Sequence, residues 1–175
     1  MTKKLYVVED VWDYKNLHCA IVFNGRNCTR CGYVGISSNN YYYNYKGKFT
    51  DIDEFDVHGG ITYDKIGEYP VSYGDSIRWI GFDCAHGSDA QDFDAFEHYL
   101  KNGSLVMSEQ EYNIIKSFIQ MSSLNEDELL DWNKGTVKLE VKKLADQVAV
   151  SFSDIFTKNL REGKTFQEAA KKYKR

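Results

Sequence analysis

The stretch Leu17-His18-Cys19-Ala20-Ile21-Val22-Phe23-Asn24-Gly25 decides the fold class of the chain. Its first seven residues form a nearly continuous apolar run, which is typical of a buried strand, and Asn-Gly is a strong signal for a hairpin turn. Residues 31–36, Cys-Gly-Tyr-Val-Gly-Ile, are therefore predicted to form the partner strand of a hairpin.

Further short strands are expected on both sides of this hairpin. They are predicted at residues 5–8, 54–58, 61–63 and 77–83, where apolar residues alternate or cluster between turn residues. Residues 37–50 are polar and aromatic without any period, so we expect a long loop there. The first half of the chain is thus predicted to be rich in β-structure.

The second half changes to helical periodicity. Residues 92–100 predict a short helix, and Ser108-Glu109-Gln110-Glu111 is a capping box that opens another. Residues 136–150 carry an apolar stripe of helical spacing, and residues 165–168 form a second capping box. The sequence therefore predicts a single α+β domain over residues 1–175. Residues 1–89 would form a β-rich body that carries the motifs below, and residues 90–175 would form helices that pack on it or project from it.

The composition argues against several classes of protein. The 175 residues include 22 Lys and Arg against 26 Asp and Glu, and a net charge of −4 argues against broad electrostatic binding to nucleic acid or to an anionic membrane. No apolar run approaches the roughly 20 residues that cross a bilayer, and residues 1–10 lack the apolar core of a secretory signal. We therefore expect a cytoplasmic protein with neither a membrane nor a nucleic-acid partner.

The four cysteines, Cys19, Cys28, Cys31 and Cys84, are expected to be free thiols, because no secretory signal directs the chain to an oxidising compartment. Cys28 and Cys31 have the C-x-x-C spacing that can place two thiolates on one metal ion. Cys84 and His86 would complete a four-ligand zinc site. The alternative is an inert pair near a turn, with Cys19 packed as a small apolar residue in a strand.

Tyrosine is the most unusual part of the composition, with 13 residues, of which ten lie between Tyr6 and Tyr73. The rings of Tyr41-Tyr42-Tyr43-Asn44-Tyr45 cannot all face one core, since successive strand side chains alternate. We expect at least two of them to contact another chain, as in a homo-oligomer, or to line a ligand cavity near His58. The alternative is an ordinary β-rich half, since tyrosine favours strands.

Reactive side chains are concentrated in two segments, Asp56-Val57-His58-Gly59-Gly60-Ile61-Thr62-Tyr63 and residues 79–89, Trp-Ile-Gly-Phe-Asp-Cys-Ala-His-Gly-Ser-Asp. In each segment a predicted strand runs into small residues beside a histidine, and glycine lets backbone N–H groups approach a ligand. If the two strands are neighbours, His58, Asp83, Cys84 and His86 converge at one edge of the sheet. We predict that His58 and His86 lie within about 6 Å of each other, the distance over which two side chains share a ligand.

Three motifs give the chain a resemblance to a known set of proteins. They are Cys31-Gly32-Tyr33-Val34-Gly35, the motif at residues 56–63, and Gly81-Phe82-Asp83-Cys84-Ala85-His86. In this order they resemble small, uncharacterised, phage-encoded proteins that carry C-G-Y-V-G, D-V-H-G-G-[IL]-T and G-F-D-C-A-H. The resemblance covers residues 17–89 and implies a viral context, in the cytoplasm of the host cell. The family pattern has no cysteine matching Cys28, which directs attention from the C-x-x-C pair to Cys31, His58, Cys84 and His86.

Two hypotheses assign chemistry to these motifs. In the first, a zinc ion is the cofactor, Asp56 or Asp83 orients one of the histidines, and the ligands are Cys31, His58, Cys84 and His86. In the second, Cys84 is a nucleophile, His58 or His86 is its base, and the Gly59-Gly60 amides form an oxyanion hole. Either would make the protein a zinc- or thiol-dependent hydrolase.

The third hypothesis, which the sequence favours, is a pocket without bond chemistry for a small polar ligand such as a nucleotide. Its lining would be His58, Gly59, Gly60, Thr62, Tyr63, Arg78, Asp83, Tyr42 and Tyr43. The protein would then be a phage-encoded accessory protein of the counter-defence kind that binds such a ligand or a host protein, without a cofactor. A purely structural alternative remains, in which His58 and His86 hydrogen-bond turns and Cys84 packs in the core.

Overall fold

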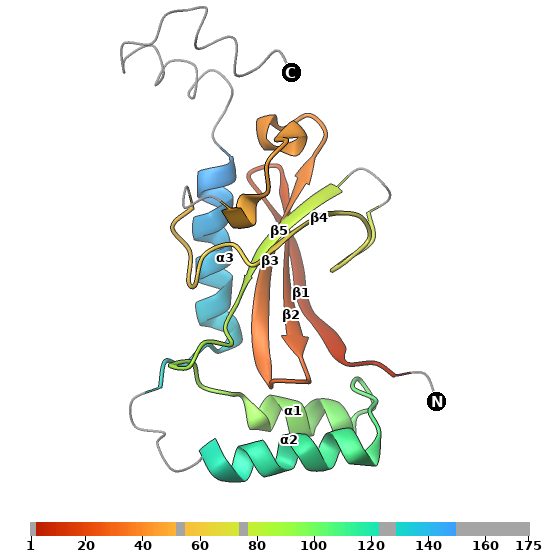
Figure 1. Ribbon diagram of the computed structural model, residues 1–175. Coiled ribbons are helices and arrows are strands. Elements are labelled where there is room, and N and C mark those ends of the chain that lie inside the picture. Colours follow the sequence, from red (N-terminus) through yellow and green to blue (C-terminus); the bar gives the residue numbers. More distant parts are fainter. Residues whose placement is uncertain (1–2, 52–54, 74–76, 123–128, 150–175) are drawn as a thin grey trace, which may run out of the picture.

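The computed structural model describes residues 3–51, 55–73, 77–122 and 129–149 (Figure 1). Within them, five strands form one antiparallel sheet in the order β1-β2-β3-β5-β4. The strands are β1 (Tyr6–Tyr14), β2 (Leu17–Asn24), β3 (Thr29–Ser37), β4 (Tyr63–Ile66) and β5 (Ile77–Asp83). The helices are α1 (Phe93–Lys101), α2 (Glu109–Ser122) and α3 (Lys134–Val148), with two 3-10 helices, η1 (Tyr41–Asn44) and η2 (Phe49–Asp51). The predicted α+β class, a β-rich N-terminal body followed by helices, is confirmed.

The predicted central hairpin is formed by β2 and β3. Their register runs from His18 opposite Gly35 to Asn24 opposite Thr29, and residues 25–28 make the turn. Almost every residue of both strands is buried, because elements pack on both faces of the sheet. This is why the sequence shows nearly continuous apolar runs here instead of a clean alternation.

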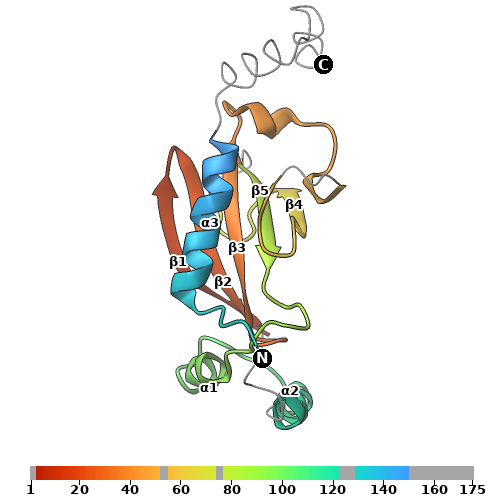
Figure 2. The same ribbon diagram turned by 90° about the vertical axis from the view of Figure 1, so that its left-hand side faces the viewer.

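Helix α3 covers one face of the sheet (Figure 2). Its buried residues Val137, Val141 and Leu144 share the main hydrophobic core with strand residues such as Ile21. At Gly32 the helix approaches the sheet so closely that an added Cβ would lie 2.5 Å from Val141 Cγ2. The missing side chain at this position of β3 therefore lets α3 pack directly on the strand.

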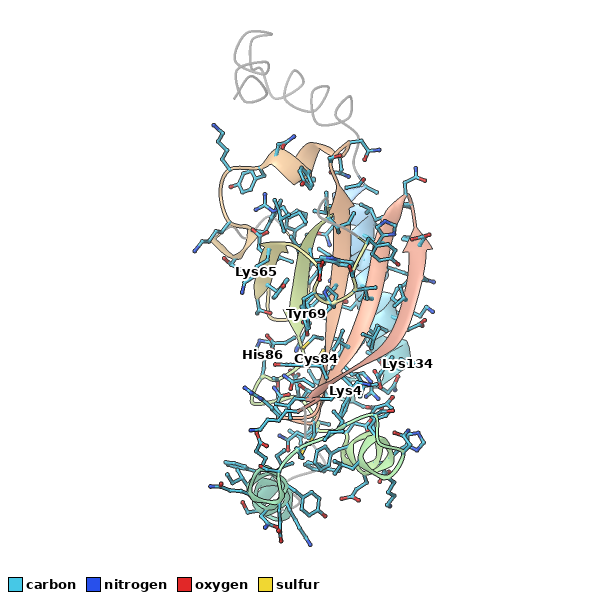
Figure 3. All side chains as sticks on the ribbon, turned by 90° about the vertical axis from the view of Figure 1, so that its right-hand side faces the viewer. Lys4, Lys65, Tyr69, Cys84, His86 and Lys134 are labelled. Atoms are coloured by element: carbon cyan, nitrogen blue, oxygen red, sulfur yellow. The ribbon has the colours of Figure 1, made fainter. Side chains whose placement is uncertain are left out.

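The opposite face, toward the viewer in Figure 3, is covered in part by the segment between β4 and β5. Tyr69 of this segment lies over the sheet, and its hydroxyl is 3.2 Å from that of Tyr33. The rings of Tyr33, Tyr63 and Tyr69 contact one another, and Tyr69 also contacts Tyr6 edge-on. These N-terminal tyrosines thus belong to the packing of a β-sheet face.

Helices α1 and α2 lie beyond one end of the sheet (Figure 1). Asp92 caps α1 by accepting a hydrogen bond from the Ala95 N–H at 2.9 Å, and the predicted capping box forms between Ser108 and Glu111. The cluster that joins these helices to the sheet contains Phe23, Cys28, Phe96, Leu105 and Ile115. No helix in the described ranges has the length and apolarity needed to cross a membrane. The second predicted capping box, at residues 165–168, lies outside those ranges.

Two expectations about the loops are wrong. The described part of residues 54–58 is not a strand, because its backbone bonds to α3: Asp56 N–H donates to Gln147 Oε1 (2.8 Å), and Gln147 Nε2 donates to Asp56 O (3.0 Å). Phe55 and Val57 are buried in the main core, and Asp56 between them is exposed, which resembles the period of a strand. Residues 37–50, expected to be irregular throughout, contain η1 and the start of η2.

Candidate metal centre

Three loop segments, residues 55–61, 84–90 and 129–133, meet beside α3 and bring together His58, His86 and Asp89. Figure 3 shows His86 near the end of the sheet that faces α1 and α2. Among the described residues, these three form the one group of at least three His, Cys, Asp or Glu side chains whose ligand atoms all lie within 4.8 Å of one another. This group, the His58–His86–Asp89 cluster, is the candidate site.

Backbone contacts fix the position of each member. The His58 N–H donates to Glu140 Oε1 on α3 at 2.8 Å, and the adjacent Val57 is buried in the main core. The turn after β5 is closed by the Asp89 N–H, which donates to His86 O at 3.0 Å, while the His86 N–H donates to Asp89 Oδ2 at 2.9 Å. The relative placement of His86 and Asp89 is therefore local, and that of His58 depends on packing against α3.

The three ligand atoms form a small triangle. His58 Nε2 is 2.8 Å and His86 Nδ1 is 3.1 Å from Asp89 Oδ2, and the two ring nitrogens are 3.1 Å apart. The prediction that His58 and His86 lie within about 6 Å of each other is confirmed. Asp89 was inside the segment that the sequence singled out, but no role was predicted for it. Its spacing of three residues from His86, typical of a tight turn, was the signal that could have revealed it.

Protons and a cation offer two ways to fill this triangle. With a proton on each of the two facing ring nitrogens, both N–H groups donate to Asp89 Oδ2, which also accepts the His86 backbone N–H. The two ring N–H groups then lie side by side, with their nitrogens 3.1 Å apart. A cation at the centre of the triangle would contact all three atoms at once and remove this crowding of N–H groups.

The carboxylate of Asp89 is anionic although it is fully buried, with a side-chain exposure of 0%. Burial by itself would raise the pKa of Asp89, but the hydrogen bonds from the His58 ring and from the His86 N–H and ring outweigh it and lower that pKa. The cluster thus presents a negative oxygen and two imidazole nitrogens to one point, which is a ligand set that suits a first-row divalent metal.

The size of the triangle is close to what such an ion requires. Bonds of about 2.0–2.1 Å from zinc in tetrahedral geometry place neighbouring ligand atoms ~3.3 Å apart. The observed separations of 2.8–3.1 Å are shorter by a few tenths of an ångström, so small side-chain rotations admit the ion. The His86 side chain is 38% exposed, which leaves the cluster open to solvent on the side of this ring.

Gly59 makes room for the His86 ring. Its φ of +66° is in the left-handed region, and an added Cβ would lie 2.1 Å from His86 Cε1. Gly60 also has a positive φ, +77°, but an added Cβ there would meet no atom within 4 Å. The Gly60 N–H donates to Val57 O at 3.0 Å, so it is not directed at a reacting oxyanion as the thiol-hydrolase hypothesis required.

Trp132, which the sequence analysis missed, completes the surroundings of the cluster. Its Nε1–H donates to Asp89 Oδ1 at 2.9 Å, and its ring centroid is 4.2 Å from that of His58. No pattern in the sequence around Trp132 indicated this role, because it comes from a contact across 43 residues of chain.

The predicted cysteine ligands do not join the histidines. Cys31 lies in the cluster on the face opposite α3, Cys84 in the main core under α3, and Cys28 near α1 and α2. All four cysteines are buried. Burial raises the pKa of Cys19, Cys28 and Cys31 to about 12, and burial together with the charge of Asp89 raises the pKa of Cys84 as well. The Cys84 thiol is therefore protonated at neutral pH, which argues against the predicted nucleophile.

Arg78, predicted to bind a ligand, donates hydrogen bonds from all of its side-chain nitrogens to acceptors within the protein. Nε and Nη2 donate to the Asp64 carboxylate at 2.7 and 2.6 Å, and Nη2 also donates to Gly47 O at 3.0 Å. Nη1 donates to the carbonyl oxygens of Tyr43 and Tyr45. These five bonds use all five N–H groups of the side chain, so Arg78 ties the segment after β3 to the sheet.

The tyrosines after β3 pack on the protein's own core. Tyr42 contacts Phe49 and Phe55, with ring centroids 5.7 and 5.5 Å apart, and Tyr43 packs against the same cluster. The preceding Asn40 donates to Val148 O at the last turn of α3, whereas His58 bonds to Glu140 near the middle of that helix. The described ring contacts of Tyr42 are to Phe49 and Phe55, and a role of these tyrosines at the His58–His86–Asp89 cluster stays a prediction. Their predicted contact with another chain stays a prediction.

The remaining residues of the predicted pocket do not converge either. Tyr63 lies in the tyrosine cluster on the face opposite α3. The Thr62 N–H donates to Gly81 O at 2.8 Å, and Asp83 Oδ1 accepts from the Ala85 N–H at 3.2 Å. Asp56, predicted to orient a histidine, is exposed and pairs with Lys143 at 3.0 Å. Of the predicted site residues, the structure thus brings together His58, Gly59 and His86.

In comparisons with known proteins, no family model, no curated protein and no solved structure matches the chain. The resemblance to phage-encoded proteins therefore stays a prediction from the sequence motifs, and the functional argument depends on the geometry of the cluster.

Proposed function

We propose that the protein binds a zinc-type divalent cation through His58 Nε2, His86 Nδ1 and Asp89 Oδ2. The ion would present its remaining coordination positions to a small polar ligand. The observation that carries the proposal is the triangle of one carboxylate oxygen and two imidazole nitrogens, 2.8–3.1 Å apart.

The ligand set supports a site in which the ion keeps a coordination position free for water, a substrate or another ligand. Structural zinc sites have four protein ligands, usually with thiolates, whereas catalytic zinc is held by three protein ligands and keeps a position for water or substrate. Two imidazoles and a carboxylate correspond to the second kind. The cysteine thiols, protonated and placed in separate clusters, leave the histidines and Asp89 as the donors.

Such an ion links two of the hypotheses drawn from the sequence. A small polar ligand would bind through an oxygen atom on the open side of the ion, next to the His86 ring. Water in the same position would have its pKa lowered toward about 7 and become a nucleophile for hydrolysis. The ligand-binding and the hydrolase hypotheses therefore predict the same first step, the binding of the ion.

Metal titration of the purified protein tests this step. Competition between the protein and a chromophoric chelator for zinc should show one ion per chain. We expect His86→Ala to abolish this binding, because two ligands rarely hold zinc against a chelator. His86 is also the most exposed of the three ligands, so the variant should fold.

His18→Ala is the matched control. His18 Nδ1 lies 2.7 Å from Asp13 Oδ1, so this variant also removes a histidine paired with an aspartate, but at a place without a third ligand. It should bind zinc like the parent. Absence of zinc binding by the parent, or equal loss in both variants, would contradict the proposal.

A spectroscopic experiment tests the open position. Cobalt(II) in place of zinc gives visible absorption bands that depend on its coordination. Addition of acetate or inorganic phosphate to the cobalt-loaded protein should shift these bands, because the anion replaces water on the ion. If neither anion shifts the bands, the ion has no coordination position that is accessible to external ligands.

A further inference from the structure

We infer that Trp132 is a positioning residue that makes Asp89 bind the ion through one oxygen only and so keeps a coordination position free for an external ligand. The inference rests on the proposed function. It concerns how one coordination position of the ion stays free, which the identity of the three ligands does not determine.

The two oxygens of Asp89 have separate partners. Oδ2 receives the His86 N–H and faces both histidine rings, at 2.8 and 3.1 Å. Oδ1 receives the indole N–H of Trp132 at 2.9 Å. The side chain of Asp89 is completely buried, so water does not compete for either oxygen. The indole can only donate, and it therefore holds Oδ1 in the orientation that directs Oδ2 at the histidines.

This division matters because a carboxylate can bind a metal through one oxygen or through both. Binding through both would use a second coordination position, the one that a small polar ligand or water needs. A hydrogen bond to Oδ1 draws its electron density away from the ion and opposes the rotation that would bring it into contact. Hydrogen-bonded partners of this kind orient the ligands of metal sites generally.

Trp132 acts on a second ligand through its ring. The ring centroid is 4.2 Å from that of His58, and the two planes are inclined by 39°. One side chain therefore fixes Asp89 by its N–H and limits the rotation of His58 by its face.

The backbone around Trp132 is fixed independently of the cluster. The Leu130 N–H donates to Ser88 O at 2.8 Å and the Ala90 N–H donates to Leu130 O at 2.9 Å, which joins this segment to the turn that carries Asp89. One residue further on, Asn133 caps α3 by accepting from the Gly135 N–H at 2.9 Å. The indole is thus placed by structure that does not depend on a metal.

The other two tryptophans provide matched controls. The Nε1 atoms of Trp12 and Trp79 have no hydrogen-bond partner among the described protein atoms, so neither indole N–H is bonded to a carboxylate.

The test is Trp132→Phe, which keeps an aromatic ring against His58 and removes only the N–H. We expect zinc affinity to fall roughly 10- to 100-fold, the usual effect of removing a hydrogen-bonded partner of a metal ligand. We also expect the visible bands of the cobalt-loaded variant to weaken, as they do when four-coordinate cobalt gains a fifth ligand, and to stop responding to acetate. Trp12→Phe removes an indole that has no such bond and should change none of these properties.

The outcomes separate the two proposals. If the parent protein binds zinc and cobalt but Trp132→Phe keeps the parent's affinity, bands and acetate response, the role of Trp132 is wrong and the metal site stands. If the parent binds no metal, both proposals are wrong. A fall in affinity with unchanged cobalt bands and an unchanged acetate response would show general loosening of the site, and would overturn the assignment of one-oxygen binding.

A measurement on the parent protein gives a test that does not depend on the folding of a variant. In a ¹H–¹⁵N NMR spectrum, the indole N–H of Trp132 should stay protected from exchange with solvent when zinc is added, because its bond to Oδ1 persists. Loss of that protection on zinc binding would mean that the ion takes both oxygens, and would overturn the inference.

Discussion

The Arg78–Asp64 pair and the His58–His86–Asp89 cluster each contain a buried carboxylate beside the same sheet, and they differ in how far they are open to solvent. The five N–H groups of Arg78 meet five acceptors. In the cluster, two ring nitrogens and one oxygen of Asp89 lie 2.8–3.1 Å apart, and the His86 side chain is 38% exposed. The first group is closed within the protein, while the second is open to solvent and is where we propose that a cation binds.

This difference separates the arginine networks of this chain from the candidate site. Arg30 belongs with Arg78: it is buried, its Nε and Nη2 bond to Glu9 at 2.6 and 2.9 Å, and its Nη1 bonds to Asp92 at 2.7 Å. Buried arginines of this kind hold loops and strands together. The candidate site differs from them because its ligand atoms lie close together and it is open to solvent.

The largest effect is expected from Arg78→Met. This change leaves the Asp64 carboxylate, whose side chain is 4% exposed, without its cation, and breaking a buried pair in this way costs about 3–5 kcal/mol. The free energy of unfolding, measured with urea, should fall by that amount, while zinc affinity of the folded protein stays unchanged.

Lys65→Met is the control for that change, because it removes an exposed charge on β4 next to Asp64 and should alter stability by about 0.5 kcal/mol at most. A loss of zinc binding by folded Arg78→Met would break the comparison, since the two groups would then not be independent.

A second effect concerns the cluster itself. On the proposed function zinc binds the folded chain and not the unfolded one, so free zinc at 100 times the dissociation constant should raise the free energy of unfolding by about 2.7 kcal/mol. Thermal unfolding with zinc and with excess chelator measures this shift. An equal shift in His86→Ala would assign it to zinc bound elsewhere.

The variants Gly59→Ala and Gly60→Ala test whether zinc binding depends on the contact between residue 59 and the His86 ring. Both positions have a left-handed φ, +66° and +77°, so both variants should lose about 1–2 kcal/mol of stability. Only at Gly59 does the new methyl group meet the His86 ring. Zinc binding should therefore be lost in Gly59→Ala and kept in Gly60→Ala. Retention of zinc by both would show that the position of His86 is not essential.

The smallest effect comes from the thiols. Burial raises the pKa of Cys19, Cys28 and Cys31 from 9.0 to about 12, so in the folded protein they stay protonated while the unfolded chain ionises. Their contribution to stability is complete below the unfolded pKa and is lost as the pH rises through 9 toward 12. At pH 9 the free energy of unfolding should be lower by roughly 1 kcal/mol than at pH 7.

Alkylation by iodoacetamide gives an independent check on the thiols. At pH 8 the folded protein should react far more slowly than the urea-unfolded chain, since protonated, buried thiols are poor nucleophiles. Rapid modification of Cys84 in the folded protein would restore it as a candidate nucleophile.

The fold could be predicted well where the signal is local. The apolar run before Asn24 predicted β2 and its hairpin, and Ser108 with Glu111 predicted the start of α2. The prediction was wrong at residues 55–58, where burial alternates because the segment packs on a helix. Period alone does not distinguish a strand in a sheet from an irregular segment whose every second residue enters the core.

For the candidate site, the sequence by itself indicated that His58 and His86 lie in glycine-containing motifs and close to each other. Only the tertiary structure decided that Asp89 and Trp132 complete the group and that the cysteines do not. Hydrogen bonds within a turn depend on residues three positions apart, and these are visible in a sequence. The bonds of Asp89 to His58 and to Trp132 join residues 31 and 43 positions apart. Such contacts form only when α3 packs on the sheet and brings the loop segments that carry these residues together.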